Sequence, residues 1–166
     1  IKPGHNLAEY ITDHGIIPGL KLDQGLAEIV QTGEPYTVGG KDLYDRARTA
    51  YDNGFRFAKW RAEFHIAKDQ PSFIATEQNA ELLANFAKEC QLAGIVPIVE
   101  SDILQDGSYS IEECAAATDR ILCAIFEKLE QRSIDLSGCL LKTNMVTSGK
   151  SVEQPATSDA IGMATA

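Results

Sequence analysis

The stretch GIVPIVESD, residues 94–102, has five consecutive apolar residues that are followed by Glu100 and Asp102. A nearly continuous apolar run of this kind is typical of a strand that is covered on both faces. Because side chains alternate with period two along a strand, Glu100 and Asp102 are expected to point to the same side. The stretch therefore predicts a buried strand that presents two carboxylates at its carboxyl end.

Three other short apolar runs also end in a pair of charged or polar residues two positions apart. The pairs are Lys21 and Asp23, Lys59 and Arg61, and Lys142 and Asn144. The four runs recur about every 40 residues, which suits repeated strand-plus-helix units with parallel strands. We therefore expect three amines and one carboxylate to gather at one end of a sheet. Burying so much charge is costly, so such a gathering usually exists for chemistry.

The other patterns along the chain complete an alternating order of helices and strands. The predicted strands are residues 16–22, 55–61, 95–100 and 139–144, and the predicted helices are residues 6–14, 41–53, 71–93, 111–129 and the chain from about Ser158. Gly54 and Gly94 are expected to end helices, and Ser110 with Glu113 forms a capping-box pattern. Residues 24–40 and 147–155 are expected to be loops.

Two architectures fit this order as one domain over residues 1–166: an open doubly wound sheet, or part of a (β/α)₈ barrel. No GxGxxG sequence follows a predicted strand, which weighs against a dinucleotide-binding fold. Charged residues at the carboxyl end of every strand favour the barrel, whose active sites lie at that face. We predict an α/β fold with about four parallel strands of a TIM barrel.

Composition limits the kinds of partner that the chain can have. Its 166 residues are 44% hydrophobic and 23% charged, which is typical of a globular protein. The net charge of −9 argues against nucleic-acid binding, but a few local cations can still hold a phosphorylated substrate. No apolar stretch is long enough to span a membrane and no signal peptide is visible, so we expect a soluble cytoplasmic protein.

The cysteines and histidines do not have metal-ligand spacing. No CxxC pair occurs, and we expect the cysteines to be reduced core residues of an intracellular protein. The cysteines are Cys90, Cys114, Cys123 and Cys139, and the scattered histidines are His5, His14 and His65. We therefore expect no metal site.

Lys142 is the sharpest candidate for covalent chemistry. It follows an apolar run, and both desolvation and a neighbouring cation such as Lys59 would favour the neutral amine, which condenses with ketones to a Schiff base. Glu100, at the end of its own apolar strand, is the candidate acid–base. The plainer alternatives are a lysine that ends a strand and reaches solvent, and a glutamate that only forms a salt bridge.

Three more side chains belong to the same candidate site. Asp102 could hold a lysine in position, or it could be a loop aspartate. Lys21 and Arg61 are candidate phosphate ligands, since Lys offers a point charge and Arg a bidentate fork, and the alternative is that both are surface cations. Trp60 lies between Lys59 and Arg61 and is expected to point toward the helices as core packing.

Four sequence strings together resemble the class I fructose-bisphosphate aldolases. The strings are GLKLD at 19–23, FAKWR at 57–61, GIVPIVE at 94–100 and LLKTNMV at 140–146. The resemblance implies a (β/α)₈ barrel of about twice this length, of which this chain would hold strands three to six and be truncated at both ends. It also implies a glycolytic lyase that uses no metal and no organic cofactor, and a homotetramer.

The resemblance assigns roles to individual residues. Lys142 would form the Schiff base, Lys59 would stabilise developing charge, and Glu100 would be the main proton shuttle. Asp102 stands near the Schiff-base lysine where the family has a glutamate, and Lys21 and Arg61 would bind substrate phosphate. Three departures from the family pattern are Ser101, which is expected to loosen a loop, the shorter Asp102, and Thr143 in place of a proline.

Other interpretations stay open at this point. Half a barrel leaves two bare sheet edges, so we expect the isolated chain to be inactive or nearly so and prone to associate. The alternatives are an inactive fragment, a pseudoenzyme or interaction module, or another Schiff-base barrel lyase or transaldolase.

Overall fold

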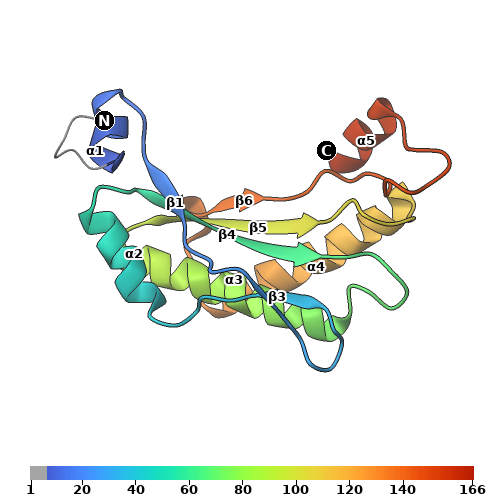
Figure 1. Cartoon of the computed structure of the whole chain (residues 1–166), viewed down its shortest axis with the longest axis horizontal. Coiled ribbons are helices and arrows are strands. Elements are labelled where there is room, and N and C mark those ends of the chain that lie inside the picture. Colours follow the sequence, from blue (N-terminus) through green and yellow to red (C-terminus); the bar gives the residue numbers. More distant parts are fainter. Residues whose placement is uncertain (1–6) are drawn as a thin grey trace.

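The computed structural model of the protein describes residues 7–166, and their central feature is a parallel sheet of four strands in the order β1-β4-β5-β6 (Figure 1). All three neighbouring pairs in this sheet are parallel, which confirms the predicted α/β arrangement. The elements are α1 (Leu7–Asp13), β1 (Gly19–Lys21), β2 (Leu26–Glu28), β3 (Pro35–Thr37), α2 (Leu43–Asp52), β4 (Phe57–Phe64), α3 (Phe73–Ala93), β5 (Val96–Ile103), α4 (Ile111–Gln131), a short 3₁₀ helix (Leu136–Gly138), β6 (Leu140–Lys142) and α5 (Ser158–Thr165).

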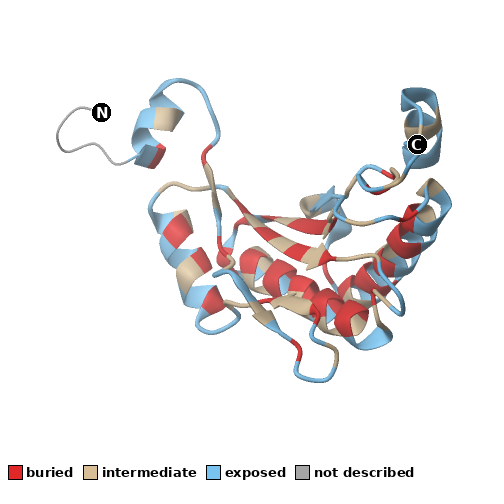
Figure 2. Ribbon diagram, turned by 45° about the vertical axis from the view of Figure 1, so that its right-hand side comes forward, coloured by how far each residue is buried: buried red, intermediate tan, exposed pale blue. Residues whose placement is uncertain are grey.

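Helices α2, α3 and α4 all lie on one side of the sheet, and they do not cover its other face (Figure 1). A doubly wound sheet would have helices on both faces, so this layering matches the barrel rather than the open alternative. The buried residues line the surfaces where these helices and the sheet meet (Figure 2). We call the uncovered face of the sheet, from which Lys59 and Glu100 project, the inner face.

Strand β4 shows how the sequence separates the two faces. Its residues alternate between half-buried and fully buried positions along the whole strand. Trp60 is fully buried on the helix side, and its ring centroid lies 5.5 Å from that of Phe86 in α3. The predicted packing role of Trp60 is therefore confirmed, and Lys59 and Arg61 are left on the inner face.

Three of the predicted helix ends agree with the structure. Gly94 ends α3 with a φ of 84°, a left-handed conformation that glycine adopts without steric cost. Ser110 and Glu113 form the expected capping box, in which the Ser110 hydroxyl accepts from the Glu113 N–H at 3.2 Å and the Glu113 carboxylate accepts from the Ser110 N–H at 2.7 Å. Helix α5 begins at the expected Ser158.

Residues 24–40 were expected to be a loop, and this is wrong in part. The antiparallel strands β2 and β3 form a hairpin there, and Gly33 adopts a φ of 69° in the turn between them. Gly33 lies in the turn of this hairpin, Gly25, Gly39 and Gly40 flank its strands, and Pro35 is the first residue of β3. Thr37 at the end of β3 donates a hydrogen bond from its hydroxyl to the Arg61 carbonyl at 2.6 Å, so the hairpin is attached to β4.

Several predicted boundaries also shift. The first strand begins at Gly19 rather than residue 16, because its pairing partner β4 starts at Phe57, opposite Gly19. Ile16 and Ile17 are consequently exposed. Strands β4 and β5 each continue three residues beyond their predicted ends, because they pair with one another as far as Phe64 and Ile103. The predicted start of the first helix at residue 6 lies outside the described residues, as does His5.

The cysteines differ from expectation at one position. Cys90 and Cys114 are buried, Cys139 is half-buried, and none of the four is in a disulfide. Cys123, which was also expected in the core, is exposed on α4. It lies two positions from the buried Ile121 and Ile125, on another face of the helix.

Candidate active site

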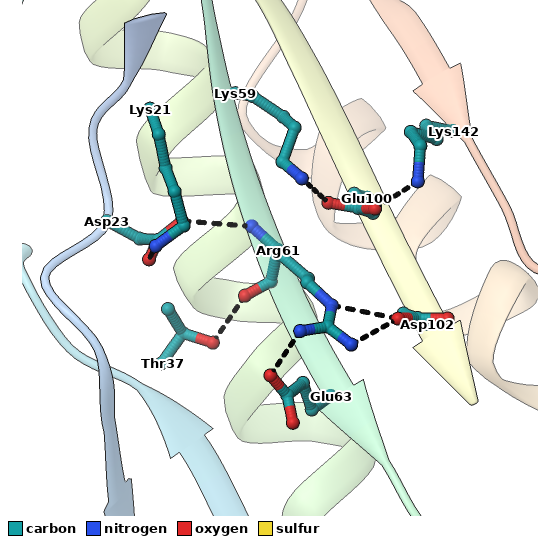
Figure 3. A network of polar contacts seen from close by, with 9 residues as sticks. All are labelled: Lys21, Asp23, Thr37, Lys59, Arg61, Glu63, Glu100, Asp102 and Lys142. Carbon is teal, nitrogen blue, oxygen red and sulfur yellow. Dashed lines mark hydrogen bonds and ion pairs between the residues drawn. The ribbon is translucent and has the colours of Figure 1, made fainter. Parts of the chain in front are cut away.

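Three neighbouring strands bring Lys59, Glu100 and Lys142 together on the inner face (Figure 3). Glu100 and Lys142 are direct partners in the β5–β6 register, and Lys59 lies opposite Ile98, two positions before Glu100. The Lys59 Nζ lies 2.5 Å from Glu100 Oε2, and Lys142 donates to Glu100 Oε1. The expected convergence of two amines and one carboxylate is confirmed.

Glu100 is the centre of this group. Its side chain is 3% exposed, although it projects from the inner face, because the two lysines cover it. The side chains of Lys59 and Lys142 are 31% and 57% exposed, so both amines can reach solvent. Burial raises the pKa of Glu100, but the hydrogen bonds and positive charges of Lys142 and Lys59 outweigh burial and hold this pKa below its ordinary value. Glu100 is therefore an ionised carboxylate in direct contact with the amines of both lysines.

Arg61 is the centre of a second polar group on the inner face. It lies on β4, next to the strand that carries Glu100. Its Nε and Nη2 donate to Asp102 Oδ2 at 2.8 and 2.5 Å, and its Nη1 donates to Glu63 Oε1 at 2.6 Å (Figure 3). Burial lowers the pKa of Arg61, but the hydrogen bond to Asp102 and the charges of Asp102, Glu63 and Glu100 outweigh burial and hold this pKa above its ordinary value, so the guanidinium stays charged. Arg61 is held in one orientation by two carboxylates of its own chain.

Lys21 and Asp23 stand at the other edge of the same face. Lys21 forms an ion pair with Asp23, and the second Asp23 oxygen accepts from the Arg61 backbone N–H at 3.4 Å. The Lys21 side chain is 54% exposed, whereas that of Asp23 is 3% exposed. Asp23 thus connects the chain after β1 to β4, and the side chain of Lys21, the last residue of β1, reaches solvent.

Three expectations about individual side chains need correction. Asp102 was expected beside a lysine, but it pairs with Arg61, because it lies two residues beyond Glu100 in β5 and opposite Glu63 in β4. Asn144 was expected to share the orientation of Lys142, but β6 ends at Lys142, and Asn144 turns to donate to Thr118 of α4 at 3.1 Å. Ser101 does not lie in a loop, since it is a buried residue of β5 paired with Ala62.

Glu63 was missed in the sequence, although a signal for it exists. Lys59, Arg61 and Glu63 continue the same period-two pattern, alternating with the buried Ala62 and Phe64. The predicted end of the strand at Arg61 hid this continuation. Glu63 is a half-buried carboxylate that contacts the candidate phosphate ligand, so it belongs to the site.

Residues 7–166 contain neither a metal-binding cluster nor a helix that could span a membrane. No cluster of three or more His, Cys, Asp or Glu side chains there has the arrangement of a metal site. Within the same range, no helix combines the length and the apolar character that crossing a bilayer requires.

The comparisons with known proteins agree with this geometry. Residues 1–166 match the family model described as "Glycolytic: Fructose-bisphosphate aldolase class-I". The chain is 45% identical over 147 residues to "Fructose-bisphosphate aldolase 4, cytosolic" of Arabidopsis thaliana, a match that covers 88% of the chain and 37% of that relative. It is 42% identical over 165 residues to "Probable fructose-bisphosphate aldolase class 1" of Xanthomonas axonopodis pv. citri (strain 306), covering 99% of the chain and 49% of the relative.

A solved structure confirms the fold class. The fructose-bisphosphate aldolase from Plasmodium falciparum, solved in a ternary complex with TRAP and a small-molecule inhibitor, superimposes with a TM-score of 0.95 and 38% sequence identity. The match covers 99% of the chain and 48% of the Plasmodium protein, so the four strands are arranged as in part of an aldolase barrel. The chain spans between 37% and 49% of the length of these proteins. On this evidence the chain belongs to the class I fructose-bisphosphate aldolase family.

Proposed function

We propose that the protein is a lyase that reversibly cleaves fructose 1,6-bisphosphate to dihydroxyacetone phosphate and glyceraldehyde 3-phosphate, through a Schiff base on Lys142. The observation that carries the proposal is the buried Glu100 carboxylate held between Lys59 and Lys142. A carboxylate in contact with an amine can accept the proton that the amine must lose before it attacks a carbonyl. The family membership supplies the substrate class, a phosphorylated sugar.

The first half of the reaction is formation of the Schiff base. The Lys142 proton passes to Glu100, and the neutral Nζ attacks the C2 carbonyl of the ketose to form a carbinolamine. Glu100, now protonated, gives its proton to the C2 hydroxyl, which leaves as water, so that a protonated imine remains. This cycle returns Glu100 to the carboxylate that its two lysine partners favour.

The second half is cleavage of the bond between C3 and C4. The Glu100 carboxylate takes the proton of the C4 hydroxyl, the C3–C4 electron pair moves into the imine as an enamine, and the aldehyde leaves. The enamine carbon then takes up a proton, and water hydrolyses the imine to release dihydroxyacetone phosphate and free Lys142. The Lys59 ammonium stabilises negative charge that develops near Glu100 during these transfers.

The surrounding residues complete the proposal. Asp102 positions Arg61, and Arg61 and Lys21 are the cations available to substrate phosphate on this face. We also propose that the protein acts in the cytoplasm in glycolysis, since relatives such as the Arabidopsis aldolases are named cytosolic. A homotetramer is proposed from the family resemblance alone.

The test is to trap the imine by borohydride reduction in the presence of dihydroxyacetone phosphate and to locate the adduct by mass spectrometry. We expect the label on Lys142, and none in a Lys142→Met variant. A Lys88→Met variant is the matched control, because Lys88 is exposed on α3 on the far side of the sheet. Absence of label from the folded wild-type protein would instead support an inert family member, and a label on other lysines alone would remove Lys142 from the mechanism.

A further inference from the structure

The covalent chemistry proposed above uses one half of the inner face, around Glu100. The other half, around Arg61 and Lys21, takes no part in it. Lys142 lies on β6 and Arg61 on β4, two strands away, which is about 10 Å at the usual spacing of strands. In an extended ketose chain, six bonds of about 1.5 Å lead from C2 to a phosphorus atom on C6, and their zigzag spans roughly 8 Å. A substrate bound to Lys142 and directed along the sheet therefore brings its far end to Arg61.

The net charge around Arg61 and Lys21 is negative, whereas binding of a phosphate requires positive charge. Three of the five guanidinium N–H donors of Arg61 are already used, two by Asp102 at 2.8 and 2.5 Å and one by Glu63 at 2.6 Å. Lys21, the other cation at this end, is paired with Asp23 (Figure 3). Three carboxylates thus surround two cations, so a phosphate dianion arriving there meets net negative charge and competes with Asp102 and Glu63 for the guanidinium of Arg61. A hydroxyl group can instead donate to either carboxylate.

Glu63 and Asp102 do not contribute equally. Asp102 accepts hydrogen bonds from Nε and Nη2 and so fixes the plane of the guanidinium. Glu63 accepts one hydrogen bond, from Nη1. The Glu63 side chain is 17% exposed and shares a strand and a face with Arg61. Replacing Glu63 therefore frees the donors of Nη1 and removes one negative charge, while Asp102 still orients Arg61.

We propose that Glu63 is a specificity-determining residue that weakens binding of a phosphate at the far end of the ketose and favours a substrate with a hydroxyl there. This inference rests on the proposed function, since it takes the aldol cleavage and Lys142 as given. The substrate class it names is a ketose 1-phosphate, relative to the corresponding bisphosphate.

The test compares kcat/KM for fructose 1,6-bisphosphate and fructose 1-phosphate in the full-length protein and in its Glu63→Gln variant. We expect the ratio of the bisphosphate value to the monophosphate value to rise about tenfold in the variant, as expected when one nearby like charge is removed. Glu130→Gln is the matched control, because Glu130 is exposed on α4 on the opposite side of the sheet, and we expect its ratio to be unchanged. An unchanged ratio in Glu63→Gln, or an equal rise in both variants, overturns the proposal.

A second measurement separates this inference from the proposed function. The Kd of inorganic phosphate is measured by calorimetry for the wild type and both variants, and we expect about tenfold tighter binding by Glu63→Gln alone. If no protein cleaves either sugar and Lys142 takes no label, the proposed function fails, and the phosphate titration still decides the role of Glu63. Equal phosphate Kd values in the three proteins would overturn that role. Circular dichroism checks the fold, and Glu63→Met replaces Glu63→Gln if the latter does not fold.

Discussion

Replacing Glu100 with Gln should destabilise the protein in a way that depends on pH. The substitution keeps the shape of the side chain but removes the charge that Lys59 and Lys142 share. Removing one partner of a fully buried ion pair costs about 3–5 kcal/mol. Because 31% of the Lys59 and 57% of the Lys142 side chain is exposed, water compensates for much of this loss, and we expect about 1–2 kcal/mol near neutral pH.

The pH dependence follows from the pKa of Glu100. Burial raises this pKa, but the two lysines lower it more, so the folded value lies below the ordinary 4.5. A carboxyl with a lowered folded pKa binds its proton more readily in the unfolded chain. Its contribution to stability is therefore complete above the unfolded pKa and is lost as the pH falls through the folded pKa. The difference in unfolding free energy between wild type and Glu100→Gln should accordingly shrink toward zero in acid.

Urea unfolding followed by fluorescence is a direct assay for this prediction. Trp60 is the single tryptophan of the chain, is fully buried, and is the neighbour of Lys59 in β4, so its emission reports on this sheet. Curves are measured at several values between about pH 7 and about pH 3 for wild type, Glu100→Gln and the exposed control Glu130→Gln. The reasoning is refuted if Glu100→Gln is as stable as wild type at neutral pH, or if the difference between them does not fall with pH.

Three further predictions concern packing, a helix cap and metal dependence. Trp60→Ala should lower the unfolding free energy by about 3–5 kcal/mol, because the indole is fully buried against Phe86, and circular dichroism in urea measures this loss. Ser110→Ala should cost about 1 kcal/mol in the same experiment through loss of the α4 cap, and Ser110→Thr should retain most of the stability. Dialysis of the full-length protein against EDTA should leave its cleavage rate unchanged, since the proposed chemistry is carried by Lys142 and Glu100; a rate that falls and returns with added zinc contradicts that chemistry.

The sequence predicts the central sheet and the cluster of two lysines and one carboxylate because both depend on local patterns. Apolar runs that end in charged residues fix which strands exist, and period-two alternation fixes which face Lys59 and Glu100 share. The spacing of the units then predicts parallel neighbours. Convergence of the two lysines on one carboxylate needs only this much information, and the structure brings them into contact.

The parts that the sequence does not predict depend on pairing between distant residues. Which carboxylate binds Arg61 is decided by the β4–β5 register, which places Glu63 beside Asp102. Asn144 is two residues from Lys142, but its orientation depends on where β6 stops pairing and on Thr118 in α4. The β2–β3 hairpin is hidden by its turn residues, and it holds β4 through Thr37.

The two halves of the inner face, one around Glu100 and one around Arg61 and Lys21, differ in the sign of their net charge. This difference decides which chemistry each half favours. At Glu100 one carboxylate serves two amines, so the excess charge is positive, and an amine can lose a proton without leaving the carboxylate unpaired. At Arg61 and Lys21 the carboxylates are in excess, and each cation already has a partner in its own chain. The first balance suits attack on a carbonyl and stabilisation of developing negative charge, whereas the second opposes tight binding of a dianion. In the proposed reaction, we therefore expect the ketose to be held mainly through the imine and its near end, and its far end to contribute selectivity more than affinity.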